Sequence, residues 1–328
     1  MTRVAAIGCG GWGKNLVRNL VNLDALALIV DPSDAARQIA ADLGVPHESD
    51  VSNVLDRADI DAVVIATPAV MHYEVARLAL MAGKDVYVEK PIALSVEEGS
   101  VLARLADANG CVLMVGHLLQ YHPVFQKLVA MVQVGDLGKV SYVSSSRLNF
   151  GLLRTEENVL WSFAPHDVSM VLGVVGQAPL RVLATQATIL QPGIPDITSV
   201  QLEFDGGLSA EIRSSWLNPE KEQKLIVVGD KGMAVFSDRE KWSEKLIFYP
   251  NIVDWSSGRL KAVAGQAVSI AVAEGEPLKL EMSHFIDCIH TRAKPRTDAT
   301  EALEVLAVLQ AAQRSMDNGS IWCQPEAI

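Results

Sequence analysis

The chain has 328 residues, of which 49% are hydrophobic and 20% are charged, and its formal net charge at pH 7 is −11. This length and hydrophobic content predict a globular protein that divides into two domains. The negative charge, with no run of Lys or Arg, argues against binding to nucleic acid or to an anionic membrane surface. No apolar stretch approaches the roughly 20 residues that span a bilayer, and no N-terminal targeting pattern is visible, so a cytoplasmic location is expected.

The four cysteines stand far apart in the sequence. Cys9, Cys111, Cys288 and Cys323 form no C-x-x-C pair and show no zinc-ligand spacing with neighbouring histidines. We therefore expect free thiols, with neither a disulfide framework nor a metal site.

The first third of the sequence alternates short apolar runs with amphipathic segments. The apolar runs predict buried parallel strands over residues 4–7, 26–30, 62–66, 86–88 and 112–115. The segments between them predict helices over residues 33–43, 70–81 and 95–109. Ser95 and Glu98 have the spacing of a capping box at the start of the third of these helices. The regular alternation predicts an α/β Rossmann domain, a doubly wound parallel sheet, over residues 1–118.

The sequence after about residue 120 is typical of a sheet with antiparallel pairing. Predicted strands cover residues 139–150, 180–190, 199–204, 208–215, 223–228 and 233–237. Turn signals at 205–207 and 229–232 predict that the strands they join pair antiparallel. Helical spacing returns over residues 281–290 and 300–317, and these C-terminal helices could pack back on the first domain. We predict an α+β domain over residues 119–328, with helices on one face of a mostly antiparallel sheet and an open face that favours self-association.

The stretch Gly8-Cys9-Gly10-Gly11-Trp12-Gly13 follows the first predicted strand and precedes helical spacing. In such a turn the first glycine permits the tight bend, the second lets a pyrophosphate approach the backbone, and the third lets the helix pack closely. Asp31 ends the second predicted strand, where a carboxylate accepts hydrogen bonds from ribose hydroxyls and repels a 2′-phosphate. NAD is therefore favoured as the cofactor, while the nearby Arg37 leaves NADP open.

Several further motifs identify a family. Glu89-Lys90-Pro91 ends the fourth predicted strand, and Ala66-Thr67-Pro68 ends the third and is followed by His72. Gly116-His117 closes the fifth strand, and His166-Asp167 lies in the second domain. With the glycine loop, these motifs resemble the glucose-fructose oxidoreductase, inositol dehydrogenase and MocA family of NAD(P)-dependent dehydrogenases, and the resemblance covers nearly the whole chain.

The resemblance implies roles for individual residues. Lys90 would contact the reacting hydroxyl, and His166 would be the catalytic acid or base. Ser162 stands where the family often has an aspartate, four residues before this histidine, which affects how His166 is oriented. The family also implies a homodimer or homotetramer formed through the open sheet. The residues implied in cofactor binding are Gly8, Gly10, Gly11, Trp12, Gly13, Asp31, Thr67, Pro68, His72, Glu89 and Lys90.

A separate argument from the residues supports His166 as the base. Pro165 and Asp167 bracket it at the expected start of a helix that continues to Val175, where the positive end of the helix disfavours an imidazolium. A neutral imidazole can take the hydroxyl proton when an alcohol is oxidised, and a protonated Lys90 would stabilise negative charge on the oxygen.

The substrate is indicated by the stretches 116–123, 146–151 and 158–167, which together resemble a branch of the family that oxidises the C3 hydroxyl of UDP-N-acetylglucosamine or its uronate. Side chains in these stretches are candidates for contacts with the sugar and diphosphate. The candidates are His117, Arg147, Asn149, Arg154, Trp161 and Asp167. Two alternatives stay open at this point: a dehydrogenase of a free polyol or sugar such as an inositol, and an NAD(H)-binding sensor without turnover.

Overall fold

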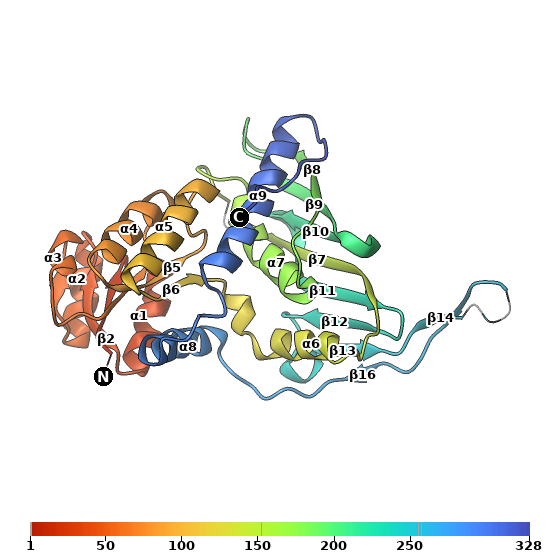
Figure 1. The fold of residues 1–328 in the computed structure, drawn as a ribbon, viewed down its shortest axis with the longest axis horizontal. Coiled ribbons are helices and arrows are strands. Elements are labelled where there is room, and N and C mark those ends of the chain that lie inside the picture. The colour runs from red at the N-terminus through yellow and green to blue at the C-terminus, as the bar shows by residue number, and fades with distance from the viewer. Residues whose placement is uncertain (1, 152, 255, 257) are drawn as a thin grey trace. The chain divides into compact units, whose positions relative to one another are not determined.

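The structure is a computed structural model that describes residues 2–151, 153–254, 256 and 258–328 (Figure 1). The chain forms two compact units. The first unit contains the chain up to Tyr121 together with Glu276–Leu306, and the second contains His122–Gly275 and Ala307–Ala327. Among the described residues, no helix is both long and apolar enough to span a bilayer.

The first unit is built on a parallel sheet in which the strands follow the order β3-β2-β1-β4-β5-β6. Its strands are β1 (Val4–Ile7), β2 (Leu26–Val30), β3 (His47–Glu48), β4 (Ala62–Ile65), β5 (Asp85–Glu89) and β6 (Leu113–Gly116). The five strands predicted from apolar runs are confirmed, and β3 is an addition of two polar residues. The strand order reverses between β1 and β4, the point at which sheets of this kind bind ligands beyond the carboxyl ends of the strands.

Helices cover both faces of this sheet. They are α1 (Gly13–Asn22), α2 (Asp34–Leu43), α3 (Ser52–Leu55), α4 (His72–Met81), α5 (Val96–Asn109) and α8 (Pro277–Thr291), with short 3₁₀ turns at Ala69–Met71 and Leu118–Tyr121. Apolar side chains of α1, α2 and α8 share one core with alternate residues of the strands. Ser95 caps α5 as predicted, because its side chain accepts a hydrogen bond from the backbone N of Glu98 at 3.1 Å.

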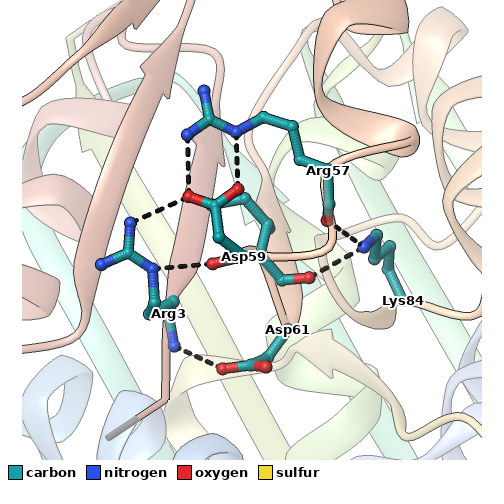
Figure 2. A network of polar contacts seen from close by, with 6 residues as sticks. Arg3, Arg57, Asp59, Asp61 and Lys84 are labelled. Atoms are coloured by element: carbon teal, nitrogen blue, oxygen red, sulfur yellow. Dashed lines mark hydrogen bonds and ion pairs between the residues drawn. The ribbon is translucent and has the colours of Figure 1, made fainter.

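A polar network fixes the amino ends of the strands, at the edge opposite the glycine loop (Figure 2). Asp59 accepts hydrogen bonds from Arg57 and from Arg3, and the backbone N of Arg3 donates to Asp61 at 2.8 Å. Lys84 Nζ donates to the carbonyls of Arg57 and Ile60 at 2.7 and 2.8 Å. The network therefore holds the turn before β4 in place.

The second unit is built on an eight-stranded sheet in the order β16-β13-β12-β11-β7-β10-β9-β8. All neighbouring strands pair antiparallel except β7 and β10, which are parallel, so the predicted mostly antiparallel sheet is confirmed. Its strands are β7 (Val140–Phe150), β8 (Arg181–Ala187), β9 (Ile197–Glu203), β10 (Ser209–Ser215), β11 (Leu217–Gly229), β12 (Met233–Ser237), β13 (Leu246–Tyr249) and β16 (Val268–Ser269). A separate hairpin pairs β14 (Ile252–Asp254) with β15 (Lys261–Val263).

Two helices, α6 (Pro123–Gln133) and α7 (Val159–Val175), pack on the second sheet and on each other. Alternate residues of β9, such as Thr198, Val200 and Leu202, are buried, while those between them are more exposed. Short 3₁₀ turns lie at Asp205–Gly207 and Trp242–Glu244, and the last helix, α9 (Ala299–Asp317), is divided between the two units after Leu306.

The predicted start of the helix that carries His166 is wrong. Helix α7 begins at Val159, because the Asn158 side chain caps it by accepting a hydrogen bond from the backbone N of Trp161 at 3.2 Å. Pro165 lies inside the helix and does not begin it. His166 is therefore about two turns away from the positive end, and the helix dipole no longer explains a neutral imidazole.

Candidate functional site

The four glycines of the loop between β1 and α1 fall into two pairs, which differ in the space around them. A Cβ at Gly8, whose φ is +90°, would lie 2.6 Å from the Ala66 carbonyl oxygen, and one at Gly13 would lie 2.1 Å from that of Gly8. A Cβ at Gly10 or Gly11 would have no protein atom within 4 Å. The first pair is required by the packing of the protein itself, whereas the second pair leaves an open surface that a ligand can approach.

The amino end of α1 next to this open surface carries no side-chain cap and no acidic residue in its first turn. Backbone N–H groups at such an end bind anions, with the helix dipole adding to the attraction. The residues present therefore fit the pyrophosphate of a dinucleotide.

The Asp31 carboxylate lies directly beside the glycine loop. Its Oδ2 accepts a hydrogen bond from the backbone N of Cys9 at 2.7 Å, and its Oδ1 accepts from the N and Oγ of Ser33 at 2.9 and 2.6 Å. Burial raises the pKa of Asp31, but these hydrogen bonds outweigh it and the pKa lies below its ordinary value. Asp31 is therefore ionised at neutral pH and can accept a hydrogen bond from a ribose hydroxyl.

His72 joins the segment after β4 to the segment after β5. Its Nε2 lies 2.9 Å from the Thr67 carbonyl oxygen, and its Nδ1 lies 2.7 Å from that of Pro91. Burial lowers the pKa of His72, and the neighbouring Lys90 lowers it further. Thr67, His72 and the Lys90-Pro91 segment are thus brought together at the carboxyl edge of the first sheet, together with the glycine loop.

Glu89 connects the glycine loop to the same edge. Its Oε1 accepts hydrogen bonds from Trp12 Nε1 at 2.6 Å and from the Tyr87 hydroxyl at 3.0 Å. Burial raises the pKa of Glu89, opposed by the Trp12 hydrogen bond and by the charge of Lys90. His117, one residue after β6, is also buried, and its Nδ1 lies 2.5 Å from Glu301 Oε2.

In the second unit, Asp167 on α7 forms a buried ion pair with Arg147 on β7. Arg147 Nε donates to Asp167 Oδ2 at 2.5 Å, and the Ser145 hydroxyl donates to Asp167 Oδ1 at 2.5 Å. Asp167 is completely buried, and its hydrogen bonds hold the Arg147 side chain in place. Asn149, two residues beyond Arg147 on the same strand, has a buried side-chain oxygen with no hydrogen-bond partner among the described residues.

The two remaining candidates for substrate contacts already have protein partners. Arg154 is exposed, with its Nε 3.6 Å from Glu157 Oε1, and its carbonyl accepts a hydrogen bond from Gln191 at 2.7 Å. Trp161 Nε1 donates to Gln313 Oε1 at 3.1 Å. Ser162 and His166 are four residues apart on α7 and so lie on one face of that helix.

Among the described residues, two carboxyl groups with no exposed surface were not predicted from the sequence. Asp196 accepts hydrogen bonds from Trp216 Nε1 at 2.5 Å and from the backbone N of Ile189 and Leu190. Glu281 on α8 is fully buried beneath the carboxyl edge of the first sheet. Asp196 lies in the loop before β9, Glu281 lies in an ordinary helix pattern, and no motif marks either of them.

The described residues contain no group of three or more His, Cys, Asp or Glu side chains that could hold a metal ion. The four cysteines are free thiols, as expected. Cys288 Sγ lies 3.4 Å from His284 Nε2, one turn away on α8, and this pair alone makes no metal site.

A parallel sheet with an open glycine loop, joined in one chain to a second, mostly antiparallel sheet, is the architecture of a nicotinamide-dependent oxidoreductase. Residues 2–117 match the family model described as an oxidoreductase family with an NAD-binding Rossmann fold, and residues 125–235 match the GFO/IDH/MocA C-terminal domain. The chain belongs to the Gfo/Idh/MocA oxidoreductase family, and it is an NAD(P)-dependent dehydrogenase that acts on a CH–OH group.

Three relatives show the range of substrates among similar proteins. The chain is 29% identical to the 4-carboxy-2-hydroxymuconate-6-semialdehyde dehydrogenase of Sphingobium sp., over 94% of this chain and 96% of that protein. It is 25% identical to the scyllo-inositol 2-dehydrogenase (NAD(+)) of Bacillus subtilis, over 97% and 94%. It is also 25% identical to the UDP-N-acetylglucosamine 3-dehydrogenase of Acidithiobacillus ferrooxidans, over 93% and 94%. A solved structure of that dehydrogenase matches with a TM-score of 0.83 at 24% identity, over 96% of this chain and 98% of that one.

Proposed function

We propose that this protein oxidises a secondary hydroxyl, at C3, of a UDP-linked N-acetylated amino sugar to a ketone, with NAD as the cofactor. The observation that carries the substrate class is the Arg147–Asp167 pair. Arg147 donates to Asp167 through Nε, and no described residue accepts a hydrogen bond from its terminal nitrogens, which leaves donors for an anionic group. The similarity to UDP-N-acetylglucosamine 3-dehydrogenase supports the same substrate class.

The preference for NAD rests on Asp31. Its carboxylate is ionised and held by Cys9 and Ser33, so it would accept a hydrogen bond from an unmodified ribose and repel a 2′-phosphate. The candidate residues for the pyrophosphate are Gly10, Gly11 and the first turn of α1.

The nicotinamide, when bound, supplies the acceptor for the hydride of the substrate. Lys90 would donate a hydrogen bond to the substrate hydroxyl oxygen and stabilise the negative charge that develops there. His166 would take the hydroxyl proton. Glu89 and His72 would hold the segment that carries Lys90, through the Trp12 and Pro91 contacts.

The proposal also covers the location of the protein, its oligomeric state and the roles of its two domains. We propose a cytoplasmic homodimer or homotetramer that forms through the uncovered face of the second sheet. Residues 1–118, on which the C-terminal helix α8 packs, would bind the cofactor, while the rest of residues 119–328 would bind substrate and form the oligomer.

A second candidate function is oxidation of a free polyol such as an inositol, which the similarity to scyllo-inositol 2-dehydrogenase favours. Equilibrium binding of UDP separates the two. The nucleotide-sugar proposal predicts saturable UDP binding that an Arg147→Ala variant weakens by about tenfold or more. The matched control is Arg213→Ala on the neighbouring strand β10, where the side chain is exposed. Absence of UDP binding would favour the polyol.

Two further variants test the role of His166 and the alternative that the protein is an NAD(H)-binding sensor without turnover. We expect His166→Ala to lower turnover by roughly 100-fold or more while NADH affinity stays nearly unchanged. An equal loss of turnover and affinity would contradict the assignment as base. A Lys90→Ala variant that binds NADH normally and retains the full biological effect would favour the sensor.

A further inference from the structure

Glu281 is a buried acid for which the proposed reaction has no direct use. It lies on α8 and is completely inaccessible to solvent. Neither of its carboxyl oxygens has a hydrogen-bond partner among the described residues. An unpaired buried carboxyl costs stability, because a leucine at this position would pack without that penalty. Its presence next to the cofactor edge of the sheet therefore calls for a physical reason.

The surroundings of Glu281 lead directly to the glycine loop. Phe285, one turn further along α8, packs on the Tyr87 ring with the ring centroids 5.9 Å apart, so Glu281 lies on the helix face that meets β5. The Tyr87 hydroxyl donates to Glu89 Oε1, and the same oxygen accepts from Trp12 of the glycine loop. The hydrogen-bonded groups Tyr87, Glu89 and Trp12 thus run from the strand on which α8 packs to the cofactor loop.

This chain is tightly enclosed at its centre. A Cβ at Gly116, at the end of β6, would lie 2.6 Å from the Tyr87 hydroxyl and 2.9 Å from Glu89 Oε2. A side chain at position 116 would therefore displace both groups, and the glycine lets Tyr87 and Glu89 pack closely against the end of β6.

We propose that Glu281 is a positioning residue, which acts through Tyr87 and Glu89 to fix Trp12 of the glycine loop and the segment that carries Lys90. The proposal rests on the cofactor site of the proposed function and does not depend on the identity of the substrate.

The charges around Glu281 determine how it can act. The charged groups that influence it are Glu89 on β5 and Glu301 on α9, and both are acidic. Burial, with the charge of Glu89 adding to it, raises the pKa of Glu281 well above its ordinary value, which favours the protonated carboxyl. The Tyr87 proton is already directed to Glu89, so toward α8 the tyrosine oxygen presents only an acceptor, which suits a protonated Glu281 as donor.

If Glu281 is the hydrogen-bond donor, two variants at this position should differ in their effect on NADH affinity. Glu281→Gln keeps a neutral donor of the same shape, so NADH affinity should stay within about twofold of the wild-type value. Glu281→Leu removes the donor, so the dissociation constant for NADH should rise by at least about threefold, while the melting temperature is maintained or raised. Asp287→Asn, an exposed position on the same helix, is the matched control.

The decisive experiment is a double-mutant cycle with Trp12→Phe, which removes the indole donor to Glu89. NADH binding is titrated by fluorescence in the wild type, in both single variants and in the double variant, with circular dichroism to verify folding. If Glu281 acts through this chain, Glu281→Leu should have little further effect once Trp12 is replaced.

Two results would overturn the proposal: unchanged NADH affinity in a folded Glu281→Leu variant, or an equal loss in both backgrounds, which would indicate a general structural role. Failure of the wild type to bind NADH would reject the cofactor proposal itself, and the positioning role with it.

Discussion

Asp31 Oδ2 accepts a hydrogen bond from the backbone N of Cys9 at 2.7 Å, which ties the end of β2 to the first turn of the glycine loop. The same carboxylate would therefore both shape the phosphate loop and select the ribose. This double role makes the residue at position 31 the main determinant of cofactor choice in our account.

Replacement of Asp31 by Asn should shift the cofactor preference. The variant loses the negative charge that would repel a 2′-phosphate, so we expect affinity for NADH to fall by about tenfold and discrimination against NADPH to shrink. Fluorescence titration with both cofactors measures this change. Asp42→Asn, an exposed position near the other end of α2, is the control. A variant that still rejects NADPH as strongly as the wild type would contradict the role of Asp31.

The two kinds of glycine in the loop predict two different phenotypes. Gly10→Ala adds a methyl group where no protein atom lies within 4 Å, so the melting temperature should be unchanged while NADH affinity falls. Gly13→Ala forces a Cβ to within 2.1 Å of the Gly8 carbonyl oxygen, so both stability and affinity should fall. Thermal unfolding and NADH titration of both variants measure these effects. Full NADH affinity in Gly10→Ala would mean that the cofactor does not approach this surface.

Part of the fold could be predicted from the sequence. The strands of the first sheet were predicted because runs such as Ala62–Ile65 are wholly apolar and are buried on both faces. The strands β3 and β16 have two residues each and no apolar alternation, so no local pattern marks them. The start of α7 was misplaced because Pro165 was interpreted as a start signal, although Asn158 is the residue that caps the helix.

The candidate site could be predicted as a set of residues but not as a set of contacts. The motifs located the glycine loop, Lys90 and His166. The partners of these residues come from elsewhere in the chain: Asp167 is 20 residues from Arg147, and Glu301 is 184 residues from His117. Such pairs follow from tertiary packing, and no spacing rule in the sequence indicates them.

The Arg147–Asp167 pair predicts a large cost when its buried member is removed. Asp167→Ala leaves Arg147, which is 13% exposed, without its counter-charge, so the free energy of unfolding should fall by about 3–5 kcal/mol. Arg147→Lys keeps the charge but loses the planar fork, so KM for the sugar substrate should rise more than kcat falls. Chemical denaturation and steady-state kinetics measure the two effects. An unchanged KM in Arg147→Lys would remove this residue from substrate binding.

His72 predicts a loss of stability in mild acid. Both ring nitrogens face carbonyl oxygens, which favour the protonated ring, but burial outweighs these contacts and lowers the pKa of the folded imidazole below the unfolded value of about 6.5. The unfolded chain therefore binds the proton more readily, and the free energy of unfolding should fall as the pH drops below about 6.5. His284, whose pKa burial also lowers, should add to the same slope.

A His72→Gln variant isolates this effect, because it cannot be protonated in either state. Its free energy of unfolding should depend less on pH in the mildly acidic range than that of the wild type. His290→Gln, an exposed position, should leave the slope unchanged. Identical slopes in the His72→Gln variant and the wild type would show that the buried imidazole does not carry the pH dependence.

The most direct test of the central claim is NADH formation by the purified protein, followed by absorbance, with NAD and a panel of substrates. The panel contains UDP-N-acetylglucosamine, its uronate, free N-acetylglucosamine, myo-inositol and the semialdehyde named for the Sphingobium relative, with a coupled aminotransferase to remove any keto sugar. Our account predicts turnover with a UDP-linked sugar and none with the free compounds. Turnover with a free polyol or the semialdehyde, and none with either UDP sugar, would contradict it.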